Sequence, residues 1–193
     1  GLPATPYDPA RARTVLASIG HGPQRPLEIE YKTSSDPFRL RVAAALQAQL
    51  AEVGIRLRIR SFDWGTFFGD IKAGRFQMYS LAWVGVESPD IFRYVLHSEA
   101  VPPVGANRGR YASAAVDAWI EAAERAVARA SSVPLFRRIQ EQAHADRVYV
   151  PLWYEGQVAA SGPRLSGYRL SPRGHYDGLA DVELTGLQRR RSR

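Results

Sequence analysis

The sequence predicts an α/β fold with a largely parallel sheet flanked by helices. Three strand-like stretches, residues 27–32, 55–60 and 76–83, are separated by segments of helix length rather than by tight turns. Connections of this length favour parallel pairing, because they are long enough to cross back over the sheet. The middle stretch, IRLRIR, alternates strictly between apolar and basic residues. It therefore has one buried face, and its arginines are expected on the solvent side.

Helix start and stop signals lie around these strands. An Asp-Pro step predicts the start of two helices, with the aspartate as the N-cap and the proline at the first helical position. A third starts after an aspartate alone, and a glycine follows the end of each. The expected segments run from Asp8 to Gly20, from Asp36 to Gly54 and from Asp63 to Gly74.

The second half of the chain predicts two longer helices and two more strands. A helix is expected over 114–130, and a second over 134–147 with Ser132 as its cap. The inward residues of the first are expected to be Trp119, Ile120, Ala123 and Val127. The apolar runs 148–155 and 157–161 are typical of strands, and the sequence becomes turn-rich beyond Gly162-Pro163.

Composition narrows the classes of function. The 193 residues contain no cysteine, which excludes disulfides and thiolate metal sites, and no apolar run approaches the roughly 20 residues that span a bilayer. The formal charge is +7, but residues 189–193 hold four arginines, so the remainder carries 7 − 4 = +3. A solvated basic tail over 187–193 is the simpler interpretation of this charge.

Catalytic and nucleic-acid functions are poorly supported by the residues. His97, Ser98 and Glu99 are adjacent, a spacing that does not form a hydrolytic triad, and no phosphate-binding glycine loop is present. The four histidines lack metal-ligand spacing, so neither a metal nor a cofactor is expected. A nucleic-acid-binding basic domain is the alternative, but Trp153 and Tyr154 lie in an apolar run without interleaved basic residues.

Two loops are candidates for ligand binding. The first, Trp83-Val84-Gly85-Val86-Glu87, directly follows a predicted strand, and Trp83 is either a platform for ligand or a core anchor. In the second, Asn107 and Arg108 either offer an amide and a guanidinium to a carboxylate, or fix a turn and point into solvent. Glu87 and Asp90 are potential cation ligands, although Asp90 is favoured as a helix cap.

The order of motifs resembles one family, the bacterial extracellular solute-binding proteins of family 5, which serve ABC importers of dipeptides, oligopeptides and nickel. The resemblance covers roughly residues 7–185. It rests on an ordered set of segments: YDPARARTVLAS, AEVGI with the alternating strand, DWGTFF, GRFQMYSLAW, NRGRY, VPLFRRIQEQAHADRVYVPLWY and SGYRLSPRG.

The resemblance implies a binding protein rather than an enzyme. Residues 1–166 are similar to the carboxy-terminal lobe of a two-lobed protein, and residues 167–186 to the segment that returns to an absent amino-terminal lobe. The family implies a monomer in the periplasm or on a lipid anchor, with a signal sequence upstream of Gly1. It also implies a small-molecule or peptide ligand and an inner-membrane ABC permease as partners, and no nucleic acid.

One position departs from the family pattern. The strand ending in tryptophan is followed in peptide binders by an acidic residue that faces the α-amino group of the ligand, and that position is Val86 here. Classical peptide recognition is therefore expected to be altered.

Overall fold

A computed structural model of the protein describes residues 2–172 and 174–185. The chain divides into two units, each of which is described by itself. The first unit comprises Gly1–Leu81 and Asp90–Tyr149, and the second comprises Ala82–Pro89 and Val150–Arg193. The basic tail expected over 187–193 lies outside the described residues, and the lobe boundary expected after residue 166 stays a prediction.

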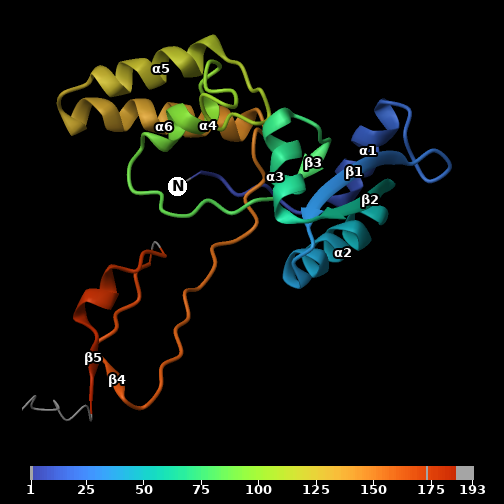
Figure 1. Ribbon diagram of the computed structural model, residues 1–193. Coiled ribbons are helices and arrows are strands. Elements are labelled where there is room, and N and C mark those ends of the chain that lie inside the picture. Colours follow the sequence, from blue (N-terminus) through green and yellow to red (C-terminus); the bar gives the residue numbers. More distant parts are fainter. Residues whose placement is uncertain (1, 173, 186–193) are drawn as a thin grey trace, which may run out of the picture. The chain divides into compact units, whose positions relative to one another are not determined.

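The first unit contains a parallel sheet, as the sequence predicts (Figure 1). Its strand order is β2-β1-β3, with β1 (Leu27–Ser34) in the centre. β1 and β2 (Ile55–Phe62) pair in register from Leu27 opposite Ile55 to Ser34 opposite Phe62. The three arginines of β2 are exposed, which confirms the interpretation of the alternating pattern.

Helices α1 (Pro9–Ser18), α2 (Pro37–Ala51) and α3 (Trp64–Ala73) begin where the aspartates predict. In each, the aspartate side chain accepts a hydrogen bond from a backbone N–H of the first turn. α2 covers one sheet face through a core cluster of Tyr31, Ala43 and Leu57. α3 ends at Gly74, whose φ of 75° is left-handed, and it lies on the opposite face, where Asp70 bonds Lys32 of β1.

The third strand is shorter than predicted. β3 covers only Met78–Tyr79, which pair with Tyr31 and Lys32 of β1. One residue earlier, the side-chain oxygen of Gln77 takes the Glu30 N–H at 2.6 Å, so a side chain replaces the backbone ladder there. The expected strand over residues 76–83 was therefore wrong in length, and beyond Leu81 the chain enters the second unit.

Three helices pack together in the rest of the first unit: α4 (Ile91–Leu96), α5 (Ala114–Arg125) and α6 (Arg129–Ala145). α5 and α6 lie side by side in Figure 1. Their shared core cluster consists of Val95, Leu96, Val116, Ile120 and Ile139. None of the described helices is long and apolar enough to cross a membrane.

Two helix boundaries in this part differ from the prediction. α5 ends at Arg125 because Ala126 has extended backbone angles, and Val127, expected inward, is fully exposed. α6 begins at Arg129 and includes Pro134, so this proline does not start the helix. Ser132 does not cap it, and its hydroxyl donates instead to the Arg129 carbonyl.

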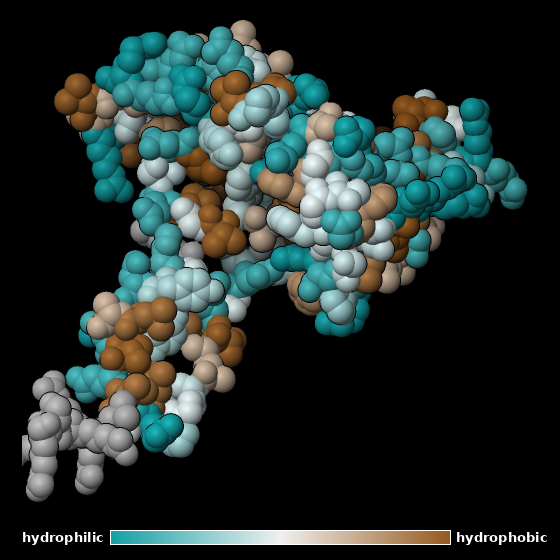
Figure 2. Space-filling view, in the orientation of Figure 1, coloured by the Kyte–Doolittle hydropathy of each residue, from teal (hydrophilic) through white to brown (hydrophobic). Residues whose placement is uncertain are grey.

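The second unit has little regular structure. It contains a short antiparallel pair, β4 (Leu165–Ser166) with β5 (Glu183–Leu184), and a 3₁₀ helix, η1 (Asp177–Asp181). The strands expected over 148–155 and 157–161 do not form, since no described strand pairs with them and Val150, Tyr154 and Val158 are exposed. Apolar surface gathers on the part of this unit that holds β4 and β5 (Figure 2). Its exposed apolar residues include Leu170, Tyr176, Leu179 and Leu184.

Candidate functional site

The candidate site in the first unit lies where the parallel strands end. Because β1, β2 and β3 run in the same direction, the side chains that follow their carboxyl ends meet at one edge. Asp63 follows β2 and caps α3 through a 3.0 Å hydrogen bond from the Thr66 N–H. Hydrogen bonds from Thr66 hold the pKa of that carboxyl below its usual range. The cap fixes the first turns of α3, which present Trp64 and Phe68.

Arg108 joins this edge from a distant part of the chain. Its guanidinium carbon lies 5.3 Å from the centre of the Phe68 ring, a cation–π distance. The Phe68 ring also has Lys72, whose Nζ lies 5.1 Å from its centre, and Trp64, which stacks on it with a centroid distance of 5.4 Å and an interplanar angle of 8°. The planar fork of donors on a guanidinium matches the geometry of a carboxylate or carbonyl group.

Two tyrosines lie within electrostatic reach of Arg108. Burial raises the pKa of Tyr79, and the nearby Arg108 charge opposes that rise. Burial likewise raises the pKa of Tyr149 to about 12, with Tyr79 adding to the shift and Arg108 opposing it. The Tyr149 hydroxyl donates to the Val95 carbonyl at 3.3 Å. Both phenols are therefore neutral at neutral pH, and both lie near the positive charge of Arg108.

Asn107 has a structural task. It is 1% exposed, and its amide nitrogen donates to the carbonyls of His97 at 3.1 Å and Tyr111 at 2.7 Å. Its side-chain oxygen accepts from the Tyr111 N–H at 2.9 Å. The alternative in which Asn107 fixes a turn thus describes what its amide does in this structure, and that turn carries Arg108.

A close backbone approach explains the glycine in this loop. A Cβ at Gly105 would lie 2.6 Å from the Ala100 carbonyl oxygen, so a side chain there would push two backbone segments apart. Ala106 N–H donates to the Tyr94 carbonyl and Asn107 N–H to the Ala100 carbonyl. The loop is thereby tied to α4 and to the turn that follows it.

The other five predicted residues, Trp83 to Glu87, form a loop of the second unit. Trp83 is 39% exposed and Val84 and Val86 are exposed too, so no side chain of this set is deeply buried. Gly85 has a left-handed φ of 71°, and a Cβ there would touch the His175 ring at 3.6 Å. The loop therefore packs against the segment that contains His175.

Glu87 has a partner that the sequence did not suggest. Its Oε1 lies 2.9 Å from Nε2 of His175, so the two form an ion pair when the imidazole is protonated. Asp90 stands at the N-cap position of α4, as predicted, but makes no capping hydrogen bond with its side chain. Its own backbone is helical, whereas a capping side chain needs extended angles. Among the described residues, no group of three or more acidic or histidine side chains could hold a metal ion.

Sequence reasoning missed Phe68, Tyr79 and Tyr149. For Phe68 and Tyr79 a signal was available in part, because residues near the ends of parallel strands gather at the carboxyl edge of the sheet. Tyr149 gave no such signal, since its place beside Tyr79 and Arg108 depends on how α6 returns the chain to the sheet.

A parallel α/β sheet with candidate ligand contacts at its carboxyl edge is typical of binding proteins, and comparisons with known proteins identify the family. The structure superposes on a periplasmic binding protein, DppA from Helicobacter pylori in complex with the peptide STSA, with a TM-score of 0.78 and 27% identity over 92% of this chain and 35% of that one. The oligopeptide-binding protein AppA from Bacillus subtilis has the same fold, with a TM-score of 0.78 and 18% identity over 95% of this chain and 39% of that one.

The family model for the middle part of bacterial extracellular solute-binding proteins, family 5, matches residues 2–100, and the chain belongs to this family. It is 33% identical over 171 residues to di/tripeptide-binding protein 2 of Pseudomonas aeruginosa, which is 86% of this chain and 32% of that protein. The chain thus spans about a third of the length of this relative. Family members are binding proteins rather than enzymes, and none of the proteins named here supports the nucleic-acid alternative.

Proposed function

We propose that this chain is the carboxy-terminal lobe of a two-lobed binding protein that captures a peptide or another small polar solute and delivers it to an ABC permease. Membership of family 5 supports the class of function. The names of its relatives, a di/tripeptide-binding protein and a peptide-bound periplasmic protein, support a peptide-like solute. Ligand contacts that are complete only when the lobes close would favour the closed form, which the permease recognises.

The observation that carries this proposal is the position of Arg108. Its guanidinium stands against the Phe68 ring, with the neutral phenols of Tyr79 and Tyr149 within electrostatic reach, at the carboxyl edge of the sheet. Ligands of open α/β sheets bind at this edge. A carboxylate or peptide carbonyl has the chemistry that a guanidinium and a neutral phenol recognise.

The loop Trp83–Glu87 of the second unit is proposed, separately, to contact ligand as well. Trp83 offers an exposed aromatic ring to ligand, while Val86 stands where peptide binders of the family carry an acidic residue. An α-ammonium without a carboxylate partner costs about 2 to 5 kcal/mol of binding free energy. Peptides with a blocked amino terminus, or neutral solutes of similar size, therefore suit this chain better than ordinary peptides.

The remaining features of the proposal follow from the family. No bond is made or broken, so no catalytic residue is assigned, and no cofactor is needed. The proposal includes a monomer outside the cytoplasm, in the periplasm or on a lipid anchor and directed there by a signal sequence, which is the arrangement that the family implies. The absent amino-terminal lobe and the permease are the macromolecular partners.

Two measurements on the full-length protein test the proposal. Mass spectrometry of small molecules released by denaturation identifies a solute that copurifies. Calorimetric titration then compares tri-alanine with free and with acetylated amino termini. We expect the acetylated peptide to bind as well as the free one or better. A strong preference for the free amine would contradict the part assigned to Val86, and the absence of both binding and a released solute would contradict the proposed function.

A further inference from the structure

His97 is a buried histidine that the proposed binding chemistry does not use. It is 3% exposed and lies directly after α4. Its Nδ1 accepts a hydrogen bond of 3.2 Å from the backbone N–H of Glu99. A backbone N–H only donates, so the neutral ring carries its proton on Nε2. The adjacent Ser98 is engaged elsewhere, since its hydroxyl donates to Asp117 at 2.6 Å.

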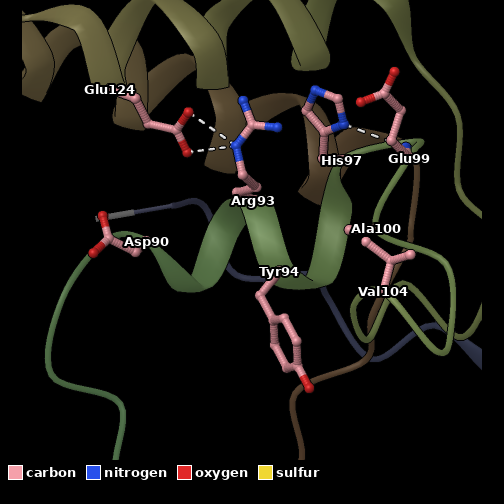
Figure 3. Close-up of a pocket in the computed structure, with 8 residues that line it drawn as sticks. All are labelled: Asp90, Arg93, Tyr94, His97, Glu99, Ala100, Val104 and Glu124. Carbon is pink, nitrogen blue, oxygen red and sulfur yellow. Dashed lines mark hydrogen bonds and ion pairs between the residues drawn. The ribbon is translucent and has the colours of Figure 1, made fainter.

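The second ring nitrogen has no hydrogen-bond partner among the described residues. Its nearest charged neighbour is Glu121 of α5, whose Oε1 lies 3.6 Å from Nε2, too far for a good hydrogen bond. Around the ring, α4 contributes Arg93, which bonds Glu124 at 2.7 Å (Figure 3). The other carboxylates of this region belong to Glu124, which interacts electrostatically with His97, to Asp117, which bonds the adjacent Ser98, and to Glu99.

The backbone of His97 supports the loop that carries Arg108. Its carbonyl accepts hydrogen bonds from the Ala100 N–H at 2.9 Å and from the Asn107 side chain at 3.1 Å. The carbonyl of Ala100 in turn accepts from the Asn107 N–H at 2.9 Å. The turn 97–100 thus provides two of the acceptors that hold Asn107, and the imidazole closes this turn through the Glu99 N–H.

We propose that His97 is a proton-sensitive positioning residue for Arg108, and this inference rests on the proposed function of Arg108 in ligand binding. In the neutral ring, Nδ1 holds the turn 97–100 closed. When a proton from solvent binds Nδ1, its lone pair can no longer accept, and the Glu99 N–H loses its partner. The imidazolium is drawn toward Glu121 instead, so the turn opens and the Asn107–Arg108 loop loses its support.

The direction of the pH effect follows from this exchange. Ligand binding favours the ordered loop and hence neutral His97, so affinity falls as the imidazole gains its second proton. Histidines ordinarily change charge between pH 5 and 8. We expect affinity to be about fivefold weaker at pH 5.5 than at pH 7.5, the factor that corresponds to one neutral hydrogen bond. By linkage, bound ligand must oppose protonation of His97 by the same factor.

Two variants of the full-length protein separate the ring nitrogens. The amide oxygen of His97→Asn reaches the place of Nδ1 and does not titrate, whereas His97→Gln reaches the place of Nε2 and leaves the Glu99 N–H without an acceptor. With acetylated and free tri-alanine as probes, the ratio of affinities at pH 7.5 and pH 5.5 should fall to about 1 in His97→Asn. His97→Gln should bind more weakly than His97→Asn at pH 7.5. A ratio in His97→Asn equal to the wild-type ratio would overturn the inference, and it also controls for the other histidines.

A second readout does not depend on any ligand. In NMR spectra of the wild-type protein, the Glu99 backbone amide and the Asn107 side-chain amide should shift with one common pH midpoint, and that step should be absent in His97→Asn. If neither amide shifts, the inference fails even where affinity varies with pH. If neither peptide binds, tri-alanine is not a ligand, and the two amide signals alone decide whether His97 controls the loop.

Discussion

The ammonium of Lys32 lies 2.7 Å from the carboxylate of Asp70, which joins the central strand β1 to helix α3. Lys32 is almost completely buried, and Arg75 bonds the second oxygen of Asp70 at 2.8 Å. Hydrogen bonds from Lys32, which has the larger effect, and from Arg75 hold the pKa of the Asp70 carboxyl below its ordinary value. This contact orders the helix that presents Trp64 and Phe68.

Asp70→Asn is expected to lower the melting temperature at pH 7 because it leaves the Lys32 ammonium with only the more distant Glu30 carboxylate, 3.8 Å away. The folded-state pKa of Asp70 is depressed, so its stabilisation is present above pH 4 and is lost as pH falls through the folded-state value. The difference between variant and wild type should therefore shrink below about pH 4 in a series of thermal melts. Glu141→Gln, an exposed carboxylate on α6, is the control. A difference that stays constant down to pH 2 would contradict the assignment.

Asn107→Ala should reduce the free energy of unfolding by about 3 kcal/mol, since it strands the buried partners of the amide. Asn107→Asp keeps an acceptor for the Tyr111 N–H but sets a carboxylate against the carbonyls of His97 and Tyr111. At pH 7, Asn107→Asp should reduce the free energy of unfolding by at least as much as Asn107→Ala. The reduction should be smaller in acid, where the new carboxyl group is protonated. Urea unfolding measures both. If the two variants unfold like wild type, the amide does not organise this turn.

Trp83→Ala should weaken ligand binding by roughly 1 to 3 kcal/mol while the melting temperature changes little, because a half-exposed ring contributes little to a core. Calorimetry with the solute released from the full-length protein gives the affinity, and a thermal melt gives the stability. The reverse pattern, a much lower melting temperature with unchanged affinity, would identify Trp83 as a core anchor.

Tyr149 should ionise at about pH 12, later than an ordinary tyrosine, in an ultraviolet absorbance titration. A raised folded-state pKa means that its stabilising effect is complete below pH 10 and is lost as pH rises toward 12. Tyr149→Phe should remove the late step and reduce the alkaline loss of stability. Tyr7→Phe, which removes an exposed phenol, is the matched control. If the late step persists in Tyr149→Phe, it belongs to another tyrosine.

The parts of the fold that the sequence predicts well depend on local rules. Asp8, Asp36 and Asp63 cap helices because a carboxylate and the N–H groups three residues on are neighbours in any chain. The strand 55–60 was equally clear because one buried face imposes a period of two. Neither inference requires knowledge of distant residues.

The predictions were wrong where the structure of a segment depends on residues far away in the sequence. Nothing local predicts that the Gln77 side chain replaces a ladder bond of β3, or that the apolar run after Tyr149 lacks a partner strand. The candidate site likewise depends on contacts between residues that are distant in the sequence. Arg108 and Asn107 were identified as candidates from their chemistry, but their separate tasks follow from Phe68 and His97, which lie 40 and 10 residues away in sequence.

The unequal bonding of the central strand has a consequence for local stability. β1 is paired with β2 along eight residues but with β3 at only two. Amide hydrogens on the β1–β2 side should exchange with solvent only through large openings, whereas those of residues 76–81 should exchange through small local ones. Tyr79 lies in the second group. The softest backbone of the sheet is thus expected at β3, close to Arg108, the residue on which the proposed ligand binding rests.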